Sequence, residues 1–91
     1  MSVQAAAGMA ASVDLKVLIG RNIALARESA GMSINDLIAA QDTNFPPFDR
    51  QQLWKWEHGY RRPRDETLIR IGRITGRSLS WFYELHNDPE V

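Results

Sequence analysis

The fold is decided by one stretch of the chain, Asp49-Arg50-Gln51-Gln52-Leu53-Trp54-Lys55-Trp56-Glu57-His58-Gly59. Asp49 is a favourable N-cap residue and Gly59 stands where helices commonly end, so the stretch predicts a helix over residues 50–58. Leu53 and Trp56 are three residues apart and can both face a core. The polar residues between them then occupy the opposite side of the helix, exposed to solvent.

That outer arc carries side chains that can read DNA base edges. Arg and Lys donate to guanine O6 and N7, Gln pairs with adenine N6 and N7, and an aromatic ring can contact thymine methyl groups. The predicted base-contacting residues are Arg50, Gln51, Trp54 and Lys55. For Trp54 an alternative stays open, in which its ring packs against the preceding loop through Phe45 or Phe48.

Working outward, glycines and capping residues divide the rest of the chain into further helices, and no segment alternates as a strand does. We expect helices over residues 14–30, 34–41, 65–75 and 79–85, which gives an all-α, five-helix bundle. Ser33 and Ser78 are the expected caps of the second and the last of these helices. Pro46 and Pro47 make residues 42–48 a loop. Residues 14–86 form the predicted domain, between a flexible N-terminal tail (1–13) and a C-terminal tail (87–91).

Length and composition narrow the class of protein. The 91 residues suffice for one domain, and the absence of cysteine excludes disulfides and thiolate metal sites. No apolar run is long enough to cross a bilayer and no secretory signal is evident, so we expect a cytoplasmic protein. His58 and His86 lack neighbouring ligands, and no glycine-rich phosphate loop is present. We therefore expect no metal, no cofactor and no enzymatic activity.

The charge is distributed unevenly although the net charge is zero. Residues 50–77 hold eight basic and three acidic side chains, a net charge of +5. Residues 1–49 carry five acids and three bases (net −2), and residues 78–91 carry three acids (net −3). This asymmetry predicts a basic face that suits a polyanion. A solvated helix surface with internal salt bridges is an equally good interpretation of charge alone.

The order of several short motifs resembles the lambda-repressor-like helix-turn-helix family, which includes Cro proteins and phage repressors. The resemblance covers residues 19–83. It is carried by Ile19-Gly20-Arg21-Asn22-Ile23 with Arg27, Gly31-Met32-Ser33 with Leu37, Leu53 to Gly59, Arg62-Pro63-Arg64, Thr67-Leu68, and Gly76-Arg77-Ser78-Leu79-Ser80-Trp81-Phe82. In that family the second helix of the motif enters the major groove while the first crosses the DNA backbone.

The resemblance also implies roles for individual residues. It places Arg50, Gln51 and Lys55 on base edges. The implied phosphate contacts are Ser33, Gln52, Tyr60, Arg61, Arg62 and Arg64. It further implies that Arg27 pairs with Glu57, because an acid at the C-terminus of a DNA-facing helix repels phosphate and opposes the helix dipole. The alternative is that these two are unrelated surface charges.

The chain departs from the family's pattern before the recognition helix. The segment from Leu37 to Leu53 is about five residues longer than the usual helix-turn-helix spacing, so the turn is an extended loop. Ile38 stands where the family generally has Ala, and Ile34 replaces a Gln that often grips the backbone. These differences concern the docking angle of the helix over residues 34–41.

A homodimer is expected for two reasons. The segment 79–85 carries five large apolar residues, of which Leu79 and Phe82 complete the core while Trp81 or Leu85 is left for an interface. Two-fold dimers also read two half-sites. We therefore expect a transcriptional regulator, a phage or bacterial repressor or Cro-like protein, that binds double-stranded DNA and takes no small-molecule ligand. The alternative is an antitoxin or another protein-interaction module built on the same fold.

Overall fold

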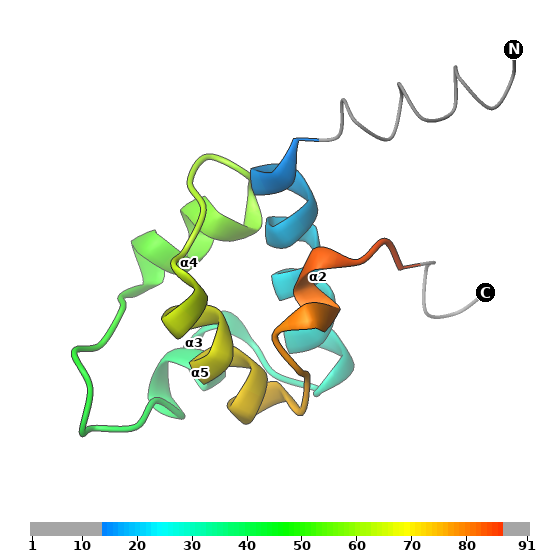
Figure 1. The fold of residues 1–91 in the computed structure, drawn as a ribbon. Coiled ribbons are helices and arrows are strands. Elements are labelled where there is room, and N and C mark those ends of the chain that lie inside the picture. The colour runs from blue at the N-terminus through cyan, green and yellow to red at the C-terminus, as the bar shows by residue number, and fades with distance from the viewer. Residues whose placement is uncertain (1–13, 87–91) are drawn as a thin grey trace, which may run out of the picture.

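The computed structural model describes residues 14–86, which form four α-helices and a final 3₁₀ turn (Figure 1). The elements are α2 (Leu15–Ser29), α3 (Ile34–Ala39), α4 (Arg50–Glu57), α5 (Asp65–Thr75) and the 3₁₀ turn η1 (Ser80–Tyr83). Within this range the chain has no strand. The all-α prediction is therefore confirmed, and no helix there is both long and apolar enough to cross a bilayer. The predicted tails, 1–13 and 87–91, lie outside the described residues.

Side-chain caps set where the first three helices begin. Asp14 accepts a hydrogen bond from the Lys16 amide at 2.9 Å. The expected cap of α3 is a full capping box, in which the Asp36 amide donates to Ser33 Oγ at 3.0 Å and the Ser33 amide donates to the Asp36 carboxylate at 2.9 Å. Such reciprocal pairs satisfy amides that have no partner within the helix. The predicted boundaries of these helices are accurate to within two residues.

The core lies where α2 meets the other helices. Its fully buried members come from every element: Ile19, Ile23, Ala26, Leu37, Leu53, Leu68, Ile71 and Phe82. Leu15 and Ala30, which share the helical spacing of the α2 core residues, are exposed instead, because they lie at the two ends of α2 beyond its partners. The middle of α2 therefore lies at the centre of the core.

Gly20 allows α2 and α4 to approach closely. A Cβ atom at this position would lie 2.0 Å from the Trp56 carbonyl oxygen, a distance at which atoms overlap. The backbone of α4 therefore rests directly on α2. This contact fixes the C-terminal half of α4 from its inner side.

The predicted fifth helix is wrong in its extent. Residues 80–83 form one 3₁₀ turn rather than a helix over residues 79–85. The turn ends because Glu84 is extended, with φ −104° and ψ 152°. Side chains bond the carbonyl groups at this end: Asn22 Nδ2 donates to the Phe82 and Glu84 oxygens at 2.9 and 2.8 Å, and His86 Nε2 bonds the Trp81 oxygen at 2.7 Å. Phe82 is nevertheless buried and Leu79 half-buried, as expected, and 73% of Leu85 is exposed.

Candidate nucleic-acid interface

Helix α4 has a buried inner side and an exposed outer side. Leu53 is fully buried and Trp56 is 8% exposed, whereas 45% of Trp54 is exposed. All four predicted base-contacting residues lie on the exposed side: Arg50, Gln51, Trp54 and Lys55. The prediction of which tryptophan enters the core is therefore confirmed. The arrangement presents basic and amide groups from a helix whose opposite side is locked in the core.

The predicted pair between Arg27 and Glu57 is formed. Arg27 Nε donates to Glu57 Oε2 at 2.7 Å and Nη2 donates to Oε1 at 3.0 Å, with 12% and 5% of the two side chains exposed. Arg27 Nη1 also donates to the Met32 carbonyl oxygen at 2.9 Å. The hydrogen bond to Glu57 raises the pKa of Arg27 further above its ordinary value. One guanidinium thus connects the C-terminal ends of α2 and α4 and neutralises the acid on α4.

Trp54 belongs to a group of parallel aromatic rings on the exposed side of α4. The His58 ring lies 4.0 Å from it, and the Tyr60 ring lies 5.6 Å from it, with interplanar angles of 22° and 13°. His58 Nδ1 is 2.8 Å from the Trp54 carbonyl oxygen. Because a carbonyl can only accept, Nδ1 carries the hydrogen. The alternative packing of Trp54 on the loop does not occur; Phe48 instead meets Trp56 edge-on at 5.1 Å.

Basic residues line a hollow of about 550 Å³ between α4 and the loop that follows it. Its lining is Gln52, Lys55, Trp56, Arg61, Arg62, Pro63, Arg64 and Thr67. Arg61 and Arg64 are exposed, and neither forms an ion pair with a carboxylate of residues 14–86. Tyr60 is 65% exposed beside them. The hollow therefore offers positive charge from Arg61 and Arg64 that no carboxylate of residues 14–86 compensates, next to the exposed side of α4.

Arg62 differs from these neighbours because it is engaged within the protein. Its Nη2 lies 3.4 Å from the Asp65 carboxylate and donates to the Tyr83 hydroxyl, and the guanidinium stands 5.2 Å from the centre of the Tyr83 ring. The Tyr83 hydroxyl in turn donates to Asp65, which raises the pKa of Tyr83. Any phosphate contact by Arg62 would compete with this internal acid.

Two further predicted phosphate contacts act as helix caps. Ser33 caps α3, and the hydrogen bond from its backbone amide to the Asp36 carboxylate lowers the pKa of that carboxyl. Gln52 completes the capping box of α4. Its side-chain Oε1 accepts from the Asp49 backbone amide at 2.9 Å, while its own backbone amide donates to Asp49 Oδ1 at 2.8 Å. Since Oε1 is occupied, the Nε2 group of Gln52 is the one oriented for an external acceptor.

No family model, curated protein or solved structure matches this chain. Among residues 14–86 no three His, Cys, Asp or Glu side chains gather closely enough to hold a metal ion.

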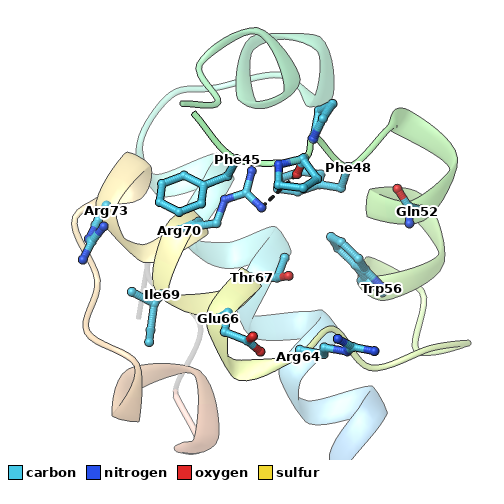
Figure 2. Close-up of a pocket in the computed structure, with 12 residues that line it drawn as sticks. Phe45, Phe48, Gln52, Trp56, Arg64, Glu66, Thr67, Ile69, Arg70 and Arg73 are labelled. Carbon is cyan, nitrogen blue, oxygen red and sulfur yellow. Dashed lines mark hydrogen bonds between the residues drawn. The ribbon is translucent and has the colours of Figure 1, made fainter. Parts of the chain in front are cut away.

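Two polar residues that the sequence did not single out shape the loop before α4. Gln41 spans its base: the Phe48 amide donates to Gln41 Oε1 at 2.9 Å, and Gln41 Nε2 donates to the Phe48 oxygen at 2.8 Å. Arg70 of α5 holds the loop from the other side through the Pro46 oxygen at 3.1 Å and Gln41 Oε1 at 3.2 Å. Figure 2 shows the Arg70 guanidinium beside the rings of Phe45 and Phe48.

The clamped loop has a consequence for α4. Phe48, the last loop residue, is 5% exposed, so the chain enters the N-cap of α4 from a fixed position. An extended turn is thus compatible with a firmly placed helix. No local pattern marks Gln41 or Arg70 in the sequence, because their partners are backbone atoms 7 and 24 residues away.

Proposed function

We propose that the protein is a transcriptional regulator that binds double-stranded DNA in a sequence-specific manner. In this proposal α3, the loop 42–48 and α4 form a lambda-repressor-like helix-turn-helix whose turn is extended, and α4 enters the major groove. The helical arrangement and the order of the motifs support it.

The observation that carries the proposal is the division of α4 into two sides. Leu53, Trp56 and Glu57 hold the inner side through the core and the Arg27 pair, so the outer side can be presented rigidly. Arg50, Gln51 and Lys55 are all long donors with complementary partners on base edges. A helix that served only packing would have no need of this set on its exposed side. Trp54, flanked by His58 and Tyr60, would contact thymine methyl groups or sugars.

Phosphate contacts would supply most of the affinity. Arg61 and Arg64, which form no ion pair within residues 14–86, are the strongest candidates, with Tyr60 and the Nε2 group of Gln52 beside them. Ser33, at the start of α3, would contact a phosphate of the DNA backbone. Arg62 would contribute only if it left Asp65.

We further propose that two copies bind together through the C-terminal region. Leu85 is 73% exposed and Trp81 half-buried, so η1 and the residues after it offer an apolar surface. A two-fold pair would place two α4 helices about one helical turn of DNA apart.

Selection of bound sites from random double-stranded DNA tests the proposal. We expect a short enriched half-site, repeated with inverted symmetry, and binding that weakens steeply with salt. The Gln51→Ala variant should relax the preference at one or two base pairs, at about 1–3 kcal/mol. The Asn35→Ala variant, on the exposed surface of α3, is the matched control. No enriched sequence with the wild-type protein would contradict the proposal.

A further inference from the structure

A second concave surface lies between the loop 42–48 and α5, and it adjoins the basic hollow at Gln52, Trp56, Arg64 and Thr67. This cleft of about 600 Å³ is closed at one end by the loop and bordered by α4 and α5 (Figure 2). Gln52 and Trp56 form its α4 wall, and Thr67, Ile69 and Arg70 form its α5 wall. The cleft is large enough for several side chains of a peptide.

Several apolar side chains that line the cleft are exposed to solvent. Phe45 is 44% exposed and Ile69 is 38% exposed, and Pro46 and Pro47 next to them are exposed as well. Phe45 is kept there by Arg70, whose guanidinium carbon stands 5.4 Å from the ring centre. An exposed phenylalanine held in a fixed position beside an exposed isoleucine is typical of an interaction surface.

The same cleft is positively charged. Arg64, Arg70 and Arg73 line it against one acid, Glu66. None of the three arginines pairs with a carboxylate of residues 14–86, and Arg70 bonds only neutral oxygens, those of Pro46 and Gln41. The positive charge is therefore left for a ligand to neutralise.

We propose that this cleft is a docking site for an acidic, apolar segment of another protein. Aromatic or aliphatic side chains of that segment would pack between Phe45 and Ile69, and its carboxylates would pair with Arg64 and Arg73. This proposal does not require DNA binding by α4, although Gln52 and Arg64 line both this cleft and the basic hollow beside α4.

The lining argues against two other occupants. A DNA phosphate gains nothing from the apolar Phe45, Pro47 and Ile69 surfaces that line the cleft. A second copy of the chain, placed symmetrically across the same surface, would bring six arginines together with only two glutamates. An acidic, apolar segment satisfies both the charge and the exposed rings.

Selection from a displayed library of random linear peptides against the intact protein tests the site. We expect the enriched peptides to combine Asp or Glu with aromatic or branched aliphatic residues. One enriched peptide is then synthesised, and its affinity is measured by fluorescence anisotropy for wild type and three variants. Arg73→Glu and Ile69→Ser should each weaken binding roughly tenfold, as loss of a central contact does. Arg21→Glu, which reverses an exposed arginine on α2, should leave it unchanged.

Circular dichroism of each variant shows whether it is folded, and amide shifts on adding the synthetic peptide locate its site in the wild type. Shifts centred on the loop 42–48 and on Ile69 and Arg73 of α5 would support the proposal. No enrichment, enrichment without acidic residues, equal loss in Arg21→Glu, or shifts centred on Arg50, Lys55 and Arg61, which lie outside the cleft, would each overturn it. Because DNA is absent throughout, failure here is distinct from failure of the proposed DNA binding.

Discussion

Arg27 and Glu57 form a two-point ion pair across 30 residues of sequence, with N–O distances of 2.7 and 3.0 Å. The pair joins the last turn of α2 to the last residue of α4. Both side chains are largely shielded from water, so each charge depends on the other for compensation. The orientation of α4 therefore depends on a polar contact as well as on Leu53 and Trp56.

Removing one member of the pair should destabilise the protein strongly. Arg27→Met leaves the Glu57 carboxylate buried without a partner, and we expect a loss of roughly 3 kcal/mol in the free energy of unfolding by urea. The double variant Arg27→Met/Glu57→Leu should recover most of this loss, because no buried charge remains.

Glu28→Gln is the control for that experiment. Glu28 also lies near Arg27, at 3.8 Å, but its side chain is 67% exposed. Its replacement should change stability by less than about 0.5 kcal/mol. Equal losses in Arg27→Met and Glu28→Gln would contradict the assignment of the buried pair as the stabilising contact.

A methyl group at Gly20 should force α2 and α4 apart. Its Cβ would meet the Trp56 carbonyl oxygen at 2.0 Å. The Cβ is fixed to the backbone of α2 and the oxygen belongs to the backbone of α4, so neither atom can move alone. We expect Gly20→Ala to lower stability by roughly 2–3 kcal/mol in urea unfolding, despite the higher helix propensity of Ala. Arg21→Ala, at the next and exposed position, should stay within about 0.5 kcal/mol of wild type. A stable Gly20→Ala variant would mean that the close approach is not required.

Much of this fold follows from patterns that are local in sequence. The caps at Ser33 and Asp49, the spacing of Leu53 and Trp56, and the helix breaks at Gly59 and Gly76 each depend on neighbours within a few residues. Such signals predicted the four α-helices and the exposed side of α4 correctly. The Arg27 pair spans 30 residues and was expected only through a family resemblance.

The features that the sequence did not predict involve side chains bound to distant backbone. Asn22 donates to carbonyl groups 60 and 62 residues away at the end of the last turn, and Gln41 and Arg70 bind the backbone of the loop in the same way. An Asn or Arg in an amphipathic helix looks like any surface residue until the fold brings its partner near. Arg62, named from the sequence only as a phosphate contact, likewise bonds to Tyr83, which lies 21 residues away.

Asn22 should therefore be essential for the C-terminal turn. Asn22→Ala removes the donor shared by the Phe82 and Glu84 oxygens and leaves the buried one without a partner. We expect a loss of about 2 kcal/mol or more in unfolding free energy, together with faster amide exchange in residues 79–86. Asn35→Ala, an exposed amide on α3, is the control. Unchanged exchange in the turn would contradict this role.

The Tyr83 hydroxyl should make stability sensitive to alkaline pH. Its hydrogen bond to Asp65 raises the pKa of Tyr83 in the folded protein above its ordinary value of 10.0. A raised folded pKa means that this contribution is fully present below about pH 10 and is lost as pH rises through the folded value. Unfolding free energy should thus fall over that alkaline range in wild type and less in Tyr83→Phe. In Asp65→Asn the phenolate absorbance should appear at lower pH than in wild type, and identical titrations would contradict the assigned cause.

If α4 binds DNA, Asp65 should weaken that binding by holding Arg62. The carboxylate and a phosphate would compete for the same guanidinium, which now lies 3.4 Å from Asp65. Asp65→Asn should raise DNA affinity and steepen the dependence of log affinity on log salt by about one, the slope of one additional phosphate contact. Glu84→Gln removes an equal charge from an exposed site without an arginine partner in residues 14–86, so it should leave the slope unchanged. Adding Arg62→Ala to Asp65→Asn should abolish the steeper slope. If it persists without Arg62, the effect comes from net charge and not from release of this side chain.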